Sequence, residues 1–265
     1  MLHTMNRILA RTVILGVAIG LGATALWAKN PIPTSTPFVE HFARLDPNLW
    51  YISDGWSNGP QQNCTWSKSA LAIGKNGGLD LKYIPPGKAG DKALCAEVQT
   101  KKWFRYGTFE ARMKSAPGSG LNAAFFSFTG AIHKQPHDEI DFERLTRAPN
   151  LVWLNRYVSG NDFGDGQYYH FAPASDDGYH NYAFIWAPDS LKWYVDGVLV
   201  RKETAHVPTH PMKIYFSHWG SDTLKNWMGP FKQPTAPVVM NVTRFAYTPL
   251  GQRCVFPESV TCNLP

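Results

Sequence analysis

The sequence predicts an all-β protein, an antiparallel β-sandwich or jelly roll built as one domain over residues 38–265. Short segments that alternate apolar and polar residues recur along the chain, and turn signals separate them. The 22 Gly and 20 Pro residues are spread throughout, which leaves little room for long helices. No internal repeat and no linker divides this region, so we expect a single domain.

The N-terminus is typical of an export signal. Arg7 and Arg11 supply positive charge, and an apolar stretch follows from Val13 to Leu26. Ala23-Thr24-Ala25 is a small-residue cleavage site, with Ala28 as the alternative. The apolar run is short for a membrane span, although an uncleaved anchor remains the other interpretation. We therefore expect a secreted or periplasmic protein without stable membrane association.

This interpretation divides the N-terminus into a signal peptide at residues 1–25 and a flexible, Pro-rich leader at residues 26–37. Removing the signal takes away two Arg and no acid, so the net charge falls from +6 to +4. No cluster of Lys and Arg forms a basic stripe, so we expect no nucleic-acid partner. The modest positive surplus is compatible with an anionic polymer, and we expect a monomer.

The four cysteines suit an oxidising compartment. Cys64, Cys95, Cys254 and Cys262 allow two disulfides in three connectivities. We favour Cys64–Cys95 and Cys254–Cys262, the first of which would close a loop of about thirty residues. No C-x-x-C pair is present, which argues against a zinc ribbon or a thioredoxin-type site.

Four segments carry the clearest strand patterns. They are Gly78–Tyr83, Tyr106–Met113, Tyr182–Trp186 and Trp193–Val200. In the last of these, Asp196-Gly197 lies between two apolar runs, which is a strong signal for a β-hairpin.

Residues 137–143, His-Asp-Glu-Ile-Asp-Phe-Glu, concentrate four acids in a chain that has only 20. In a strand, Glu139, Asp141 and Glu143 share one face, and Ile140 and Phe142 share the other. The Cα atoms of Glu139 and Glu143 would lie roughly 13 Å apart. Side chains that lean inward would bring the two carboxyls to about 5–6 Å, close to the spacing in retaining glycosidases. Crowded carboxylates cannot all ionise, so one should hold a proton near neutral pH.

Other interpretations of this cluster stay open on the local pattern alone. A solvated helix face would also align Glu139 with Glu143, but Pro136 and the apolar alternation argue against a helix. A calcium or other cation site would use the same carboxylates. A zinc site on His133 and His137 needs a continuous helix, which Pro136 interrupts.

The motif Glu-Ile-Asp-Phe-Glu at 139–143 resembles the E-x-D-x-E motif of glycoside hydrolase family 16, in the branch that contains lichenases and xyloglucan transglycosylases. The resemblance covers about residues 38–250 and implies a concanavalin-like jelly roll with a substrate cleft on its concave sheet. The further segments that carry it are Asp54–Gly59, Asn63–Trp66, Cys95–Glu97, Gly107–Met113, Phe125–Gly130, Trp193–Gly197 and Asp222–Gly229.

The resemblance implies a role for each acid. Glu139 would be the nucleophile, Glu143 the general acid/base, and Asp141 the group that tunes the pair. The reaction would be a double displacement with retention at the anomeric carbon, without a metal or another cofactor. The expected sugar contacts are Trp56, Asn58, Glu97, Gln99, Phe126, Phe128, His137, Asn155, Tyr157, Trp219 and Trp227. Among these, His137 would either position a carboxylate or cap the strand.

Several positions depart from the family pattern. Gln99 stands where lichenases have Arg. Arg144 and Arg147 follow the motif and would favour an acidic polymer, unless Arg144 shares the Ile/Phe face and points away. The calcium-binding Asp of the family has no secure match, and Thr243 occupies its approximate position, so a structural calcium stays open but unsupported, and we expect no cofactor.

A narrower resemblance points to bacterial glycanases that shorten the exopolysaccharide succinoglycan and are described as endo-1,3-1,4-β-glycanases. It rests on Val98–Thr100, His133–Glu139, Gly220–Gly229 and the tail Cys254–Cys262. The leading expectation is a secreted retaining endo-β-glycanase that acts on β-1,3/1,4-linked glucan or on a glucose-rich exopolysaccharide. A transglycosylase shares the first half-reaction and stays open. A non-catalytic jelly-roll lectin would be expected to have lost a motif carboxylate, and none is lost.

Overall fold

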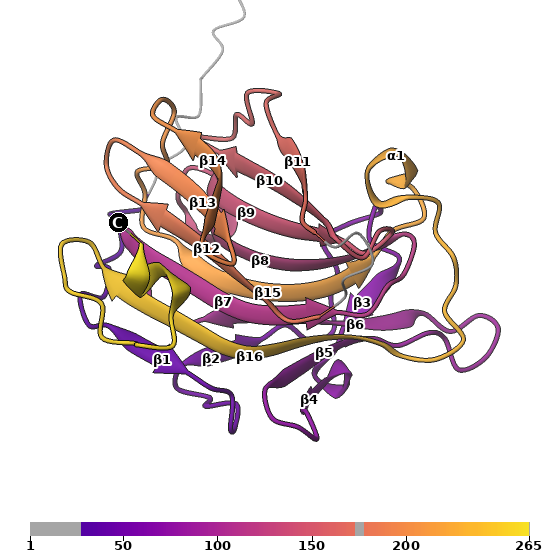
Figure 1. Ribbon diagram of the computed structural model, residues 1–265. Coiled ribbons are helices and arrows are strands. Elements are labelled where there is room, and N and C mark those ends of the chain that lie inside the picture. Colours follow the sequence, from indigo (N-terminus) through magenta and orange to yellow (C-terminus); the bar gives the residue numbers. More distant parts are fainter. Residues whose placement is uncertain (1–27, 173–177, 265) are drawn as a thin grey trace, which may run out of the picture.

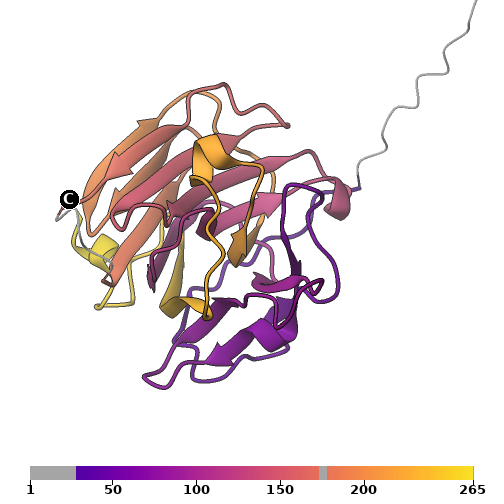
Figure 2. The same cartoon turned by 90° about the vertical axis from the view of Figure 1, so that its right-hand side faces the viewer.

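The computed structural model describes residues 28–172 and 178–264 as two antiparallel β-sheets packed face to face (Figure 1). The predicted signal peptide at residues 1–25 lies outside the described residues. Figure 2 shows the two layers from the side that carries the short helix α1. The predicted all-β sandwich is therefore confirmed.

The first layer, called here the β7 sheet, runs in the order β14-β13-β12-β7-β16-β5-β4, and β1 also pairs with β16. Its strands are β1 (Phe38–Glu40), β4 (Leu71–Ile73), β5 (Leu79–Tyr83), β7 (Gly107–Ser115), β12 (His180–Trp186), β13 (Leu191–Val195), β14 (Val198–Glu203) and β16 (Val238–Pro249). The predicted hairpin is the β13–β14 turn, where Asp196 and Gly197 have φ of 49° and 81°. Positive φ at both central residues is what a tight two-residue hairpin turn requires.

The second layer, called here the β9 sheet, runs in the order β11-β10-β9-β8-β15-β6-β2, and β3 pairs in parallel with β6. Its strands are β2 (Trp50–Ile52), β3 (Cys64–Trp66), β6 (Ala93–Thr100), β8 (Leu121–Thr129), β9 (Asp138–Leu145), β10 (Leu151–Tyr157), β11 (Gln167–His170) and β15 (Lys213–Gly220). The helical segments are η1 (Lys68–Ala70), η2 (Ala131–His133), α1 (Lys225–Met228) and η3 (Val260–Asn263). No helix in the described ranges is long and apolar enough to span a membrane.

Aromatic rings join the two layers. The ring of Phe125 on β8 stacks on Phe142 of β9, with centroids 6.0 Å apart, and on Phe184 of β12 in the opposite sheet, with centroids 5.5 Å apart. Ile140 and Phe142 are fully buried in this core. Because side chains alternate along a strand, burial of these two residues turns Glu139, Asp141 and Glu143 to the outer face of the β9 sheet.

The structure pairs the cysteines as Cys64–Cys95 and Cys254–Cys262, the connectivity favoured from the sequence. The first disulfide ties β3 to β6, beside the strand that carries Glu97. The second lies within the C-terminal tail.

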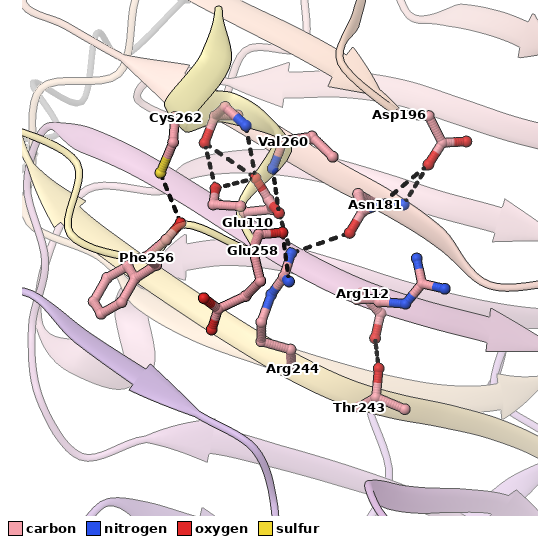
Figure 3. Close-up of polar contacts among 12 residues, drawn as sticks. Glu110, Arg112, Asn181, Asp196, Thr243, Arg244, Phe256, Glu258, Val260 and Cys262 are labelled. Carbon is pink, nitrogen blue, oxygen red and sulfur yellow. Dashed lines mark hydrogen bonds and ion pairs between the residues drawn. The ribbon is translucent and has the colours of Figure 1, made fainter.

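The C-terminal tail folds back over the outer face of the β7 sheet, where it covers Glu110 (Figure 3). The Glu110 carboxylate is 1% exposed. It accepts hydrogen bonds from the hydroxyl of Ser259 at 2.5 Å and from the backbone nitrogens of Val260 and Thr261 at 3.2 Å each. It also pairs with the guanidinium of Arg244. A buried charge on the sheet thus anchors the tail.

Candidate active site

Two of the acids on β9 line a cavity of about 580 Å³ on the outer face of the β9 sheet. Glu139 and Glu143 reach its wall, whereas Asp141 lies beneath them and is 3% exposed. Strands β8 and β10 pair with β9 along its length, so the backbone that carries these acids is held on both sides. The sequence pattern therefore placed the acids on the correct face, although only the outer two line the cavity.

Most of the expected sugar contacts lie around this cavity. Those on its wall are Trp56, Asn58, Glu97, Gln99, Phe126, Phe128, His137 and Trp219. They come from β6, β8, β15 and the loops before β3 and β9. Aromatic rings beside carboxyl and amide groups are the chemistry that binds sugars, since rings stack on pyranose faces and polar groups bind hydroxyls.

Asn155, Tyr157 and Trp227 do not line the cavity, although the sequence grouped them with the other contacts. Asn155 is 5% exposed and lies opposite Asp141 in the β9–β10 ladder. Tyr157 packs behind His137. The Trp227 ring packs against Trp219 with centroids 6.4 Å apart. Asn155 and Tyr157 therefore flank the acids on the neighbouring strand, and Trp227 contacts a wall residue.

His137 contacts the carboxylate of Glu139. Its Nε2 lies 2.6 Å from Glu139 Oε2, and its ring stacks on Tyr157 with centroids 4.6 Å apart. Burial, together with the charges of Asp141 and Glu139, raises the pKa of Tyr157 to about 12, so this phenol stays neutral. Of the two roles expected for His137, the geometry favours positioning of a carboxylate.

Glu143 has a different neighbourhood. The side-chain amide of Asn122 on β8, itself fully buried, donates a hydrogen bond to Glu143 Oε2. Burial raises the pKa of Glu143 to about 8, the Asn122 hydrogen bond opposes this shift, and the charge of Glu139 adds to it. Glu143 therefore holds a proton at neutral pH, which is the state that a general acid needs.

Asp141 is the most enclosed of the three acids. Burial, and then the charges of Glu139 and Glu143, raise its pKa well above the ordinary value. Its Oδ1 and the Oδ1 of neighbouring Asn155 are both buried without a hydrogen-bond partner in the described structure. A neutral Asp141 could donate its proton in a hydrogen bond to the Asn155 oxygen. It would also place no charge between the carboxyl groups of Glu139 and Glu143.

Glu97 and Gln99 form a polar part of the wall on β6. The Ser53 hydroxyl donates to Glu97 Oε1 at 2.6 Å. Burial raises the pKa of Glu97 to about 7, although the Ser53 hydrogen bond opposes this shift. Gln99 Oε1 accepts a hydrogen bond from the Tyr215 hydroxyl at 2.9 Å. These fixed groups give the wall both donors and acceptors for hydroxyls.

Asp138, the fourth acid of the cluster, has a structural role. Its side chain is fully buried, and it accepts hydrogen bonds from the backbone nitrogens of Ser159, Thr209 and His210 at 2.9, 2.9 and 3.0 Å. The carboxylate therefore joins two loops at the start of β9. Because these loops are far away in the sequence, the local pattern gave no signal for this role.

Sequence reasoning missed part of the cavity wall. The additional lining residues are Gly130, Ala131, Ile132, Tyr215 and Ser217. The alternation Ile214-Tyr215-Phe216-Ser217 would have placed the Tyr and Ser on one strand face. Asn122 was also missed, and its polar side chain within the otherwise apolar run of residues 121–126 was the available signal.

The two cations that follow the motif do not line the cavity. Arg144 is 1% exposed in the core, where its guanidinium donates to the Tyr182 hydroxyl at 2.5 Å and to the carbonyl of Pro149. It shares the Ile/Phe face, so of the two alternatives for Arg144 the one that points it away from the site holds, and it is not a cleft cation. Arg147 donates to the carbonyl of Trp227 at 3.0 Å and is likewise absent from the wall.

Metal ligands do not gather in this region. Within residues 28–172 and 178–264, no group of three or more His, Cys, Asp or Glu side chains is arranged to hold a metal ion. Thr243 donates its hydroxyl to the backbone carbonyl of Arg112 at 3.2 Å (Figure 3). The arrangement on β9 instead offers a carboxylate held by His137 beside a protonated carboxyl, which suits acid/base and nucleophilic catalysis.

Comparison with known proteins gives this geometry a family context. The model of glycosyl hydrolases family 16 matches residues 58–236. The chain is 44% identical over 232 residues to endo-1,3-1,4-beta-glycanase ExoK of Rhizobium meliloti, covering 86% of this chain and 84% of that protein. It is 33% identical to a beta-glucanase of Bacillus amyloliquefaciens, covering 86% and 92%. The solved structure of Bacillus licheniformis beta-glucanase superposes with a TM-score of 0.77 at 32% identity, covering 81% of this chain and 99% of that one.

Proposed function

Because the chain belongs to glycosyl hydrolase family 16 and is therefore a glycoside hydrolase, we propose that it is a retaining endo-β-glycanase acting on β-1,3/1,4-linked glucan or a glucose-rich exopolysaccharide such as succinoglycan. The observation that carries the proposal is the pair Glu139 and Glu143, which face one cavity from the same strand. The relatives named for 1,3-1,4-β-glycanase and β-glucanase activity support the substrate class.

In the first step, the carboxylate of Glu139 attacks the anomeric carbon, and the bond to the leaving glycosidic oxygen breaks. Glu143, whose raised pKa keeps it protonated, delivers its proton to that oxygen. The contact from His137 Nε2 holds the attacking carboxylate in place. The product of this step is a covalent glycosyl-enzyme and a shortened chain with a free hydroxyl.

In the second step, Glu143 has lost its proton and acts as a base. It accepts a proton from a water molecule, whose oxygen attacks the anomeric carbon and releases Glu139. Two inversions give net retention of the β configuration. Asp141, neutral and enclosed, would keep negative charge from accumulating between the two reacting groups.

The cysteine pairs and the N-terminal sequence support export, so we place the enzyme in the periplasm or outside the cell. The open wall of aromatic and polar groups supports a polymer as the partner.

The test is product analysis on two polymers. The purified protein would be incubated separately with succinoglycan and with mixed-linkage β-glucan, and the products would be followed by mass, reducing ends and anomeric NMR. We expect defined oligosaccharides that first appear as β-anomers. Initial α-anomers would contradict a retaining mechanism, and no cleavage of either polymer would contradict the substrate class.

A transglycosylase would pass the same glycosyl-enzyme to a sugar acceptor instead of water. The same incubation detects it, since transfer redistributes chain lengths without producing new reducing ends. The cavity does not by itself distinguish the two acceptors, so hydrolysis stands as the proposal on the names of the relatives.

A further inference from the structure

A lysine that the catalytic proposal does not use lies beside the cavity, where its side chain contacts the wall residue Gln99. Lys213 begins β15, two residues before Tyr215, and strand alternation therefore puts it on the same face as that wall residue. The ladders pair Lys213 with Phe128 and Phe128 with Glu139. The backbone of Lys213 thus lies two strand spacings from that of the proposed nucleophile, roughly 10 Å.

The ammonium group of Lys213 is partly buried and has no counter-charge among the residues that the structure describes. Its Nζ lies 3.5 Å from Gln99 Oε1 and 5.1 Å from the ring centroid of Trp103. No Asp or Glu oxygen in the described parts of the chain lies within 4 Å of it. Burial, and then the charge of Lys101, lower its pKa. Binding of an anion would stabilise such a cation, because the anion replaces the water that burial has removed from the ammonium group.

The polar groups around Lys213 are fixed by hydrogen bonds to one another. The Tyr215 hydroxyl lies 2.9 Å from Gln99 Oε1 and 3.3 Å from His133 Nε2. Gln99 therefore presents its oxygen to Tyr215 and Lys213, and its amide nitrogen has no partner among the described residues. Burial, together with the charge of Lys213, lowers the pKa of His133 to about 4, so this ring stays neutral.

A carboxylate matches this combination better than a sugar hydroxyl does. It accepts hydrogen bonds at two oxygens, which suits one ammonium and one amide N–H, and it neutralises the lysine. A hydroxyl would leave the charge uncompensated. The Lys213 ammonium lies over the indole of Trp103, which therefore helps to hold the cation beside Gln99.

We infer that Lys213, Gln99 and Trp103 form a subsite for a carboxylate substituent of the polysaccharide, so that the enzyme takes acidic polymers. The subsite rests on the proposed glycanase function and specifies its substrate class. In place of Arg144 and Arg147, which the sequence had offered as the source of such a preference, it assigns Lys213, whose ammonium contacts the wall residue Gln99.

The test measures binding without turnover. Mixed-linkage β-glucan would be succinylated or acetylated to the same degree, so that the two polymers carry similar esters and differ in the carboxylate. In the Glu139→Gln background, we expect affinity for the succinylated polymer to exceed that for the acetylated one by about tenfold. Lys213→Met should abolish most of this preference, and Lys213→Arg should retain it. Lys213→Gln serves as a second neutral variant if the Met variant unfolds at a lower temperature.

Lys202→Met is the matched control, since it removes the same charge from an exposed position on β14 in the other sheet. It should leave the preference intact. Equal losses in the Lys202 and Lys213 variants would show general attraction to a basic protein and would overturn the subsite, as would a preference that survives Lys213→Met. Failure of the proposed function is separate, because it appears as no cleavage of any of these polymers by the unmutated protein.

Discussion

The Nε2 atom of His137 lies 2.6 Å from Oε2 of Glu139, and His137 directly precedes β9, the strand that carries Glu139. The imidazole is held in turn by its stack on Tyr157 and by the edge of Phe128, at centroid distances of 4.6 and 5.3 Å. A ring packed on two sides loses little entropy when it donates a hydrogen bond. Glu139 is thus oriented by a preformed contact rather than by the substrate alone.

His137→Phe should lower kcat/KM by about ten- to hundredfold, because the ring packing is kept and the hydrogen bond is lost. His137→Gln, which keeps a donor, should retain more activity than the Phe variant. Steady-state kinetics on mixed-linkage β-glucan would measure both, with thermal unfolding as the check on folding. Equal activity in the Phe variant and the unmutated protein would show that the contact does not assist the reaction.

Glu139→Gln should lower turnover by several orders of magnitude, since an amide cannot form the glycosyl-enzyme. The side chain keeps its size and its acceptor oxygen, so the fold and polymer binding should persist. Azide added to Glu139→Ala should restore cleavage and give an α-glycosyl azide, which identifies the position of the missing nucleophile. A β-azide, or near-normal turnover in the Gln variant, would assign the nucleophile elsewhere.

Substitution of Asn122 should change the pH dependence of kcat/KM. Glu143 must be protonated to act as an acid, and its pKa is about 8, so kcat/KM should fall as the pH rises through about 8. The Asn122 amide stabilises the ionised form of Glu143 and so lowers that pKa. Asn122→Ala should therefore move the alkaline limb to higher pH. Measurement of kcat/KM from pH 5 to 10 would test this, with Asn76→Ala in an exposed turn as the control. An alkaline limb of Asn122→Ala that stays at the same pH or moves to lower pH would contradict the prediction.

The catalytic strand was predictable because its information is local. Ile140 and Phe142 alternate with the acids, and burial of one face decides where the other face points. The hairpin at Asp196-Gly197 was predictable for the same reason, since two successive residues with positive φ favour few residue types.

The remaining features depend on contacts between distant segments. Asp138 could be recognised as structural only once Thr209 and His210 were seen to reach it. Lys213 gained a role only when β15 was placed between β8 and β6. Arg144 is the opposite case, because strand alternation alone offered its place on the Ile/Phe face, where the structure has it.

Glu97 should make stability depend on pH. Its pKa rises from an ordinary 4.5 to about 7 in the folded protein, so the folded state holds this proton longer than the unfolded state. The protonated Glu97 therefore contributes to the free energy of unfolding below the pKa of the unfolded state. This contribution is lost as the pH rises through about 7. Glu97→Gln should remove this decline and raise the free energy of unfolding at pH 8 by about 1–3 kcal/mol.

Urea unfolding at pH 5 and pH 8 would measure the effect of Glu97→Gln as the difference between variant and unmutated protein. The comparison cancels other titrating groups, such as His218, whose pKa burial lowers to about 4. Glu258→Gln, at an exposed position, is the control and should change neither value by much. An effect of Glu97→Gln that has the same size at both pH values would refute the assignment.

Glu110 should govern attachment of the C-terminal tail. Its carboxylate joins Arg244 to Ser259 and Thr261, so Glu110→Gln leaves a buried guanidinium without its anion (Figure 3). We expect a loss of about 2–4 kcal/mol in the free energy of unfolding and faster proteolysis of the tail, with kcat retained because the site lies on the other sheet. Arg244→Met in the same chain should restore part of the loss, since it removes the stranded charge. Strictly additive effects in this double-mutant cycle would mean that the two side chains act independently and that the tail is held by other contacts.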